Sequence, residues 1–467
     1  MIPILLIMLL LPFAGILLAG IIDKWANYIA SLIGLLEIVL FIYAAHIYMS
    51  SGPFSESFYF IPGVANFELV ANNLNIVFLF LTTIVFFASY LSNGFFINEE
   101  RSSYNMLNML AQSTVLGMFL SGNLLILYLF WDVSIILFFF ILFHFGGLDR
   151  RYASIKFALY SLFSGSLLLI GIIMIYFYLP MHSFEISYLM SHGYQIPINL
   201  QLAIFILLMI SFLIKIPSFP LHSWAPDAYS EATPGGAMLL AGVVSKFGIY
   251  GMLILFISLP IARSYSFEVA SIFAISALYG SIVALSQKNI KRMLAYLSIS
   301  EMGIIGFAVS TFNVIGISGA IFGSLSHALI ISLLFMLVFL IEKVFGTSML
   351  NRLNNVIVQY PLIGYSFLFG ILATIGLPLT TGFITDLLVL IGGDKSFGLL
   401  ILLPAAAIIL NAAYLLWTYE RSFLVGENME IYDFADENAK AAIALLALFI
   451  VIIGVMPSIL LNMVGTL

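Results

Sequence analysis

The chain has 467 residues, of which 63% are hydrophobic and only 8% are charged. A soluble globular domain carries roughly 25% charged residues, so this chain cannot cover a water-facing surface. Together with a mean hydropathy of +1.16, this composition excludes a soluble enzyme, a nucleic-acid-binding protein and a disordered scaffold. We therefore expect an integral membrane protein.

Cysteine is absent, and histidine occurs only 6 times. The chain therefore has no means of forming a disulfide framework, a thiolate metal site or a Cys-ligated iron–sulfur cluster. No two histidines lie at the spacing of metal ligands. We expect neither a bound metal nor a redox cofactor in this chain.

Apolar runs of about 20 residues, the length of a membrane-crossing helix, recur along the chain. The alternating segments of about 10 residues that mark a membrane β-barrel are absent. The first run starts at Met1 without a basic start or a small-residue cleavage site, so we expect it to be retained. The sequence predicts an all-α polytopic protein with fourteen spans, at about 2–22, 26–50, 72–92, 105–121, 123–145, 153–179, 199–216, 235–258, 266–286, 293–311, 314–341, 357–391, 397–419 and 439–464.

The 16 basic residues support this order of spans. Only Arg263 and Lys395 fall in even-numbered connections, and Lys215 and Lys246 fall inside spans. By the positive-inside rule the odd-numbered connections are cytoplasmic, which places both termini on the outer side of the membrane. The odd-numbered connections hold the other twelve: Lys24, Arg101, Arg150, Arg151, Lys156, Lys288, Lys291, Arg292, Lys343, Arg352, Arg421 and Lys440.

Two spans contain helix-breaking sequences. Span seven meets prolines in 214–220 and continues as a semi-polar stretch to 234–236, and span twelve is interrupted at 376–382. Proline removes a backbone donor and clashes with the preceding turn, so each helix should unwind there. Interrupted spans in corresponding positions are typical of inverted-repeat transporters. We expect four units: 1–104, a first repeat 105–258, a second repeat 259–420, and a last helix in 421–467.

Six ionisable side chains fall inside the expected spans. Each costs roughly 2.5–3.5 kcal/mol at the bilayer centre, so each is a candidate functional group. A desolvated lysine next to a carboxylate, with a histidine nearby, suits proton relay, because moving the carboxylate changes whether the amine holds its proton. The six candidates are Asp132, Lys215, Lys246, Glu301, His327 and Asp386.

Structural roles are the competing interpretation of these charges. A lone acid in a membrane helix is about as often an ion-pair partner as a relay group, and His327, flanked by Ser324 and Ser326, also fits a satisfied core histidine. Glu37 and His46 lie outside both repeats, where a structural role is favoured.

The segment KIPSFPLHSWAPDA at 215–228, followed by Lys246, is similar to a segment of one membrane protein family. That family comprises the antiporter-like subunits of respiratory complex I, the Mrp-type cation/proton antiporters and the membrane-bound hydrogenases. Its pattern reads K-x-P-x-x-P-x-H-x-W-L-P-D-A-H. Further similar motifs are Phe130-Trp131-Asp132, Lys291-Arg292-Met293-Leu294-Ala295-Tyr296, Ser326-His327 and Gly376-Leu377-Pro378 to Asp386.

The resemblance implies a fourteen-helix proton-translocating subunit. It assigns titratable roles to Asp132, Lys215, Lys246, His327 and Asp386. An acid at 386 resembles the M-like subunit, whereas the L-like and N-like subunits and several Mrp relatives have lysine there.

The chain departs from the family pattern at several positions. Aspartate replaces glutamate at both 132 and 386, which keeps the charge and shortens the side chain by one methylene. Glu301 stands where many relatives have histidine, which puts an imidazole-based relay in span ten in doubt, although a carboxylate also carries protons. Tyr229 replaces the histidine that often ends the span-seven motif.

The resemblance therefore implies an M-like subunit of a complex I-type quinone oxidoreductase, a translocase. The chain itself would hold no redox centre, and flavin, iron–sulfur clusters and quinone would belong to partner subunits. Its partners would be neighbouring antiporter-like membrane subunits, lipids and protons, with no nucleic acid. An Mrp-type antiporter, a hydrogenase relative and a non-conducting scaffold stay open, as does Na⁺ in place of H⁺.

Overall fold

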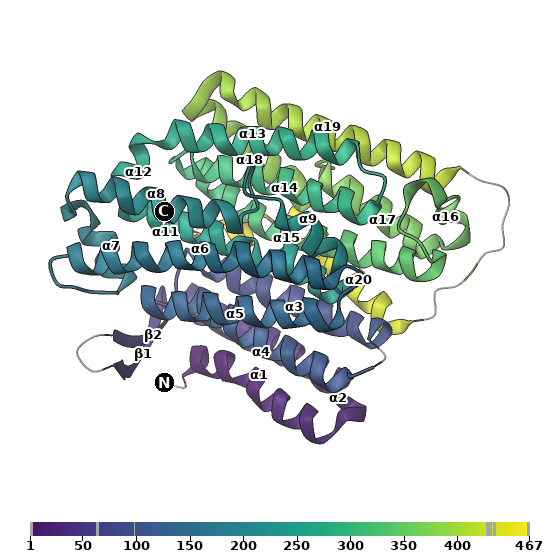
Figure 1. Ribbon diagram of the computed structural model, residues 1–467, viewed down its shortest axis with the longest axis horizontal. Helices are drawn as coiled ribbons and strands as arrows, with labels where there is room; N and C mark the ends of the chain where they lie inside the picture. The colour runs from purple at the N-terminus through teal and green to yellow at the C-terminus, as the bar shows by residue number, and fades with distance from the viewer. Residues whose placement is uncertain (1–2, 62–64, 98, 426–431, 433–435, 465–467) are drawn as a thin grey trace.

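The computed structural model describes residues 3–61, 65–97, 99–425, 432 and 436–464. The chain forms an elongated bundle in which long helices run roughly side by side, with the N-terminal helices at one edge and α19 at the other (Figure 1). The first part contains α1 (Ile4–Ile21), α2 (Ala26–Ser51), β1 (Phe54–Ile61), β2 (Ala65–Ala71), α3 (Ile76–Phe96) and α4 (Arg101–Leu120).

The middle of the chain contains three short helices, α7, α9 and α10, among the longer ones. Its helices are α5 (Leu124–Phe145), α6 (Arg150–Tyr178), α7 (Ile186–His192), α8 (Ile198–Lys215), α9 (Trp224–Glu231), α10 (Pro234–Leu239) and α11 (Lys246–Ser258). The rest of the chain contains α12 (Ile261–Ser264), α13 (Ser266–Leu285), α14 (Ile290–Val309), α15 (Val314–Phe345), α16 (Val356–Gln359), α17 (Pro361–Thr374), α18 (Thr381–Phe397), α19 (Leu402–Tyr419), α20 (Glu437–Val455) and α21 (Ser458–Val464).

Each of the fourteen expected ranges is largely helical. Within the described residues, 12 helical stretches are long and apolar enough to cross a membrane. Helix α17 is apolar but shorter, and α4 carries several polar side chains and is not among the 12. The number of crossings and the two repeats therefore stay predictions, whereas the mainly helical, polytopic architecture is confirmed.

The expected spans left 51–71 as a polar connection, but this segment contains the two strands β1 and β2. Strands β1 and β2 pair antiparallel, with Ser57 opposite Glu68 and Phe58 opposite Phe67. The hairpin lies at the same end of the bundle as α7 and α12 (Figure 1). Residues 65–69 alternate apolar and polar side chains, so the sequence already indicated a strand in the second half of this segment.

Backbone hydrogen bonds join the connections at each end of the bundle. At the hairpin end, the amide of Gly122 donates to the carbonyl of Glu68 at 2.9 Å. At the other end, the amide of Gly147 donates to Glu231 at 2.7 Å, and Ile290 donates to Ser348 at 2.9 Å. We call this second end the basic end, because Lys291, Arg292 and Lys343 line a pocket there together with Gly147 and Ser348.

Both expected helix breaks are present. Helix α8 ends at Lys215 and α9 begins at Trp224, whose indole Nε1 donates to the carbonyl of Ile214 at 2.9 Å. Helix α17 ends at Thr374, and α18 begins at Thr381 after a turn in which Leu377 donates to Leu372 at 2.9 Å. Indole and backbone donors thus satisfy carbonyls that the breaks expose.

A third irregularity lies between α10 and α11, where Leu240–Val244 is π-helical. Such bulges change the facing of the residues that follow and are frequent at functional sites. Helix α15, the longest, packs against α3, α10, α14, α17, α18 and α20, and it forms the centre around which the breaks are arranged.

Candidate functional site

Lys215, the last residue of α8, is completely buried. Its Nζ donates to the hydroxyl of Ser161 on α6 at 3.2 Å. The same Nζ lies 5.7 Å from the ring centroid of Trp131 and 5.5 Å from that of Phe157. The helix break thus ends in a lysine enclosed by two aromatic rings and a single hydroxyl, a setting in which cation–π attraction partly replaces hydration.

Asp132 lies next to Trp131 on α5 and is half-buried. In the described part of the chain its Oδ1 has no hydrogen-bond partner, and it makes no direct ion pair with Lys215. Gly165 on α6 faces this carboxylate, since a Cβ there would lie 2.4 Å from Oδ1. Ser161 and Gly165 are four residues apart on one face of α6, so the two charges are neighbours across that face.

Lys246 opens α11 directly after the π-helical turn and is also completely buried. Its Nζ lies 2.8 Å from the carbonyl of Ala241, 3.1 Å from the hydroxyl of Ser245 and 2.6 Å from Nδ1 of His327. An ammonium group has three N–H donors, and these three acceptors match them. The contact with His327 joins two helices 81 residues apart in sequence.

His327 lies on α15 with its second ring nitrogen, Nε2, directed away from Lys246. That nitrogen is buried and has no partner among the described residues. His327 lines a cavity of about 20 Å³, which is enough for a water molecule. The imidazole is therefore placed between the Lys246 amine and a site for water.

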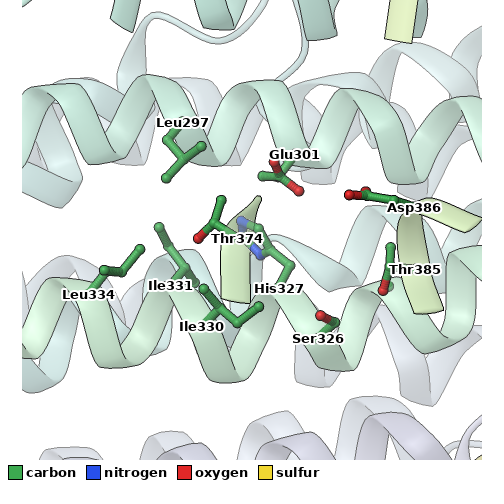
Figure 2. Close-up of a pocket in the computed structure, with 11 residues that line it drawn as sticks. Leu297, Glu301, Ser326, His327, Ile330, Ile331, Leu334, Thr374, Thr385 and Asp386 are labelled. Atoms are coloured by element: carbon green, nitrogen blue, oxygen red, sulfur yellow. The ribbon is translucent and has the colours of Figure 1, made fainter. Parts of the chain in front are cut away.

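The cavity brings Glu301 and Asp386 together with His327. The carboxylate of Asp386 on α18 points toward that of Glu301 on α14, and the imidazole extends from α15 toward the same space (Figure 2). The other residues that line the cavity are Leu297, Gly323, Ser326, Ile330, Ile331, Leu334, Thr374 and Thr385. Asp386 therefore lies just after the α17–α18 break, and Glu301 lies on α14, which packs against α18.

Glu301 has a partner that the sequence did not reveal. The amide Nδ2 of Asn411 on α19 donates to Glu301 Oε1 at 2.9 Å and to Ser300 Oγ at 3.1 Å. Ser281 Oγ donates in turn to Asn411 Oδ1 at 2.8 Å. The polar spacing of Asn411 and Tyr414 within α19 was the available signal.

The six predicted residues thus form two groups. Asp132 and Lys215 lie beside the α8–α9 break, and Lys246, His327, Glu301 and Asp386 gather near the α17–α18 break. Among the residues that the structure describes, no three His, Asp or Glu side chains are placed to hold a metal ion. The arrangement suits the transfer of protons between side chains and water.

Two comparisons with known proteins give the same family. Residues 121–409 match the family described as NADH:quinone oxidoreductase/Mrp antiporter, TM. The chain is 33% identical over 448 residues to NADH-quinone oxidoreductase subunit M of Rickettsia conorii, covering 94% of this chain and 90% of that protein.

Two solved structures share the fold. A chain of respiratory complex I from Thermus thermophilus with bound NADH superimposes with a TM-score of 0.90 at 23% identity, covering 98% of both chains. A chain of the Mrp complex from Dietzia sp. DQ12-45-1b gives a TM-score of 0.87 at 18% identity, covering 100% of this chain and 97% of that one. The chain is an integral membrane protein and belongs to the NADH:quinone oxidoreductase/Mrp antiporter transmembrane family.

Proposed function

We propose that this chain is a proton-translocating membrane subunit of the M type in a complex I-like quinone oxidoreductase. The relatives named subunit M support the assignment, and the acid at 386 agrees with it. The observation that carries the proposal is the 2.6 Å contact between the buried Lys246 amine and His327, beside a cavity that holds two carboxyl groups.

The Lys246–His327 contact provides a route for one proton. When Lys246 is an ammonium, it donates to Nδ1 of a neutral His327. Transfer of that proton to Nδ1 leaves a neutral amine and an imidazolium, which then releases the proton on Nε2 toward the cavity. Glu301 and Asp386 border the same cavity, so either carboxylate could take the proton from there.

Asp132 would act on Lys215 through the electric field. Among the described residues no hydrogen bond joins them, and the Lys215 amine donates to one neutral acceptor, the hydroxyl of Ser161. A carboxylate nearby favours the ammonium form of a buried lysine, and its withdrawal or protonation favours the amine. Small movements of α5 against α6 would therefore change how firmly Lys215 holds its proton.

In this proposal electron transfer belongs to other subunits. Flavin, iron–sulfur clusters and quinone would be bound by partner chains, and neighbouring antiporter-like subunits would pack against this one in the prokaryotic cell membrane. The sidedness, with basic connections in the cytoplasm and both termini outside, is part of the proposal. The terminal residues 1–2 and 465–467 lie outside the described residues.

A second candidate is an Mrp-type cation/proton antiporter subunit without redox coupling. The likeness to the Dietzia Mrp complex favours it as an alternative. The two are distinguished by purifying the chain with its native partners. Flavin- and iron–sulfur-bearing subunits in the purified assembly would support the first function, and their absence would support the second.

The proposed relay is tested in the whole complex, reconstituted into vesicles, by counting protons moved per quinone reduced. Lys215→Met and Asp386→Asn should each lower translocation at least about 100-fold, the effect typical of removing a proton donor or acceptor. Lys156→Met is the matched control, since Lys156 forms a partly exposed pair with Asp227 at 2.7 Å. Full pumping by both assembled variants would refute the proposal.

A further inference from the structure

Helix α19 carries a line of polar side chains that the relay above uses only at one end. Asn411, Tyr414 and Thr418 are spaced by three or four residues on one face of α19, and Ser422 follows four residues later in the π-helical turn Glu420–Leu424 that continues the helix. All four are buried, at 1%, 1%, 7% and 2% exposure. We call these four residues the α19 polar stripe. Four buried polar groups in a row are costly to keep in a membrane helix without a role.

The inner end of the stripe contacts the carboxyl site directly. Asn411 donates to Glu301 Oε1 at 2.9 Å, and its own carbonyl oxygen accepts from Ser281 at 2.8 Å. Asn411 is therefore fixed in orientation, with its donor side toward Glu301. Tyr414 lies one turn farther along the same face.

The outer end of the stripe lines a large pocket of about 550 Å³. Tyr414, Thr418 and Ser422 border it, together with Met293 and the basic residues Lys288 and Arg421. These residues come from the connections that hold most of the basic charge, so the pocket opens at the basic end of the bundle. At about 30 Å³ per water molecule, it holds well over ten.

Tyr414 stands between the pocket and the carboxyl site. Its hydroxyl is buried and lacks a hydrogen-bond partner in the described residues. Leaving such a group unsatisfied costs about 1–3 kcal/mol, which a water from the adjoining pocket removes. Among the residues that the structure describes, Thr418 donates only to the sulfur of Met293, at 3.4 Å, which is a weak acceptor that water can replace.

We propose that the α19 polar stripe is a proton path between the pocket at the basic end and the Glu301–Asp386 pair, with the Tyr414 hydroxyl as its link. Water enters the pocket to Thr418, the tyrosine hydroxyl passes the proton by accepting one and donating another, and Asn411 positions Glu301 at the inner end. This inference rests on the proposed function, and it adds the route by which the Glu301–Asp386 pair exchanges protons with the aqueous phase.

Tyr414→Phe removes the hydroxyl and keeps the ring. In the reconstituted whole complex, proton translocation should fall about tenfold, less than for a lost acid or base because water can replace a hydroxyl in part. The solvent isotope effect on translocation should rise, since the slow step becomes proton transfer. Tyr419→Phe is the matched control: Tyr419 is also buried on α19, but its hydroxyl donates to the carbonyl of Gly364 at 3.2 Å and does not border the pocket.

Access is tested by thiol labelling, because the chain has no cysteine of its own. In the whole complex in sided vesicles, Ser422→Cys should react with a membrane-impermeant methanethiosulfonate added at the basic end. Ser258→Cys, equally buried at the opposite end of the bundle, should not. The modified chain is identified by its mass.

The outcomes separate the two proposals. Normal translocation in Tyr414→Phe, or an unreactive Ser422→Cys, would overturn the path. If Asp386→Asn still abolishes pumping in that case, the proposed function stands without this route. Normal pumping in Asp386→Asn as well would remove the proposed function itself.

Discussion

The two helix breaks hold opposite chemistry. Beside the α8–α9 break, a base and an acid, Lys215 and Asp132, are separated by the face of α6 and walled by Trp131 and Phe157. Beside the α17–α18 break, two acids, Glu301 and Asp386, share a small cavity. The first group is neutral overall when both members are charged, whereas the second is neutral when both members are protonated.

This difference indicates how the same kind of break serves two purposes. Two adjacent carboxyl groups repel when both are ionised, so a pair of this kind holds a proton between its members. A base with an acid at a distance instead releases or binds its proton as the acid moves. We infer that the first break responds to charge movement and the second stores and exchanges protons with water.

The strongest way to break the comparison is to exchange the charges. Lys215→Asp places a second acid next to Asp132, among aromatic rings and with Ser161 as the nearby donor. An uncompensated buried charge costs about 3–5 kcal/mol, so this variant should lose most of the assembled complex. Asp386→Lys should assemble, because Glu301 and the cavity compensate the new charge, and it should pump about tenfold less. Assembly is measured on native gels. Equal loss in both variants would contradict the distinction.

The sequence was sufficient for the breaks and for the charges at them. Prolines at 217 and 378 predicted where the helices unwind, and the scarcity of charge made Lys215 and Lys246 conspicuous. What local patterns do not contain is which groups meet across helices. The Lys246–His327 contact spans 81 residues and depends on a π-helical turn, a backbone feature that no residue type in 240–244 requires.

The polar partners were equally hidden. Ser161 and Asn411 each bond a predicted site residue. An isolated serine such as Ser161 has no sequence signature that distinguishes it from a packing residue, and the spacing of Asn411 and Tyr414 indicates a polar face of α19 without showing which residue that face meets. The hairpin at 54–71 did have a sequence signature, in the alternation of residues 65–69, and was missed because the segment was assigned to a polar connection. Which polar side chains pair across helices therefore has to be learned from the fold.

The second prediction concerns the bridge between the groups. His327→Gln keeps a polar side chain but removes the ring that joins Lys246 to the cavity, so translocation should fall about 10- to 100-fold. The matched control is His46→Gln, which changes an exposed histidine on α2. If His327→Gln transferred electrons and still moved protons at the normal rate, Lys246 would have to reach the cavity by another route.

The smallest expected effects come from the glycines that face the two acids. A Cβ at Gly165 would lie 2.4 Å from Asp132 Oδ1, and one at Gly376 would lie 3.0 Å from Asp386 Oδ2. Gly165 is helical, so Gly165→Ala shifts the half-buried carboxylate and should lower pumping about two- to threefold with little loss of thermal stability.

Gly376 has a φ of +76°, where an alanine costs about 1–2 kcal/mol of backbone strain. Gly376→Ala should therefore lower the melting temperature of the complex more than Gly165→Ala does. This order of melting temperatures follows if the α8–α9 break works through the position of its charges and the α17–α18 break works through its backbone conformation around water. A pumping defect confined to Gly376→Ala, with Gly165→Ala fully active, would mean that the distance between Asp132 and Lys215 does not set the proton affinity of the lysine.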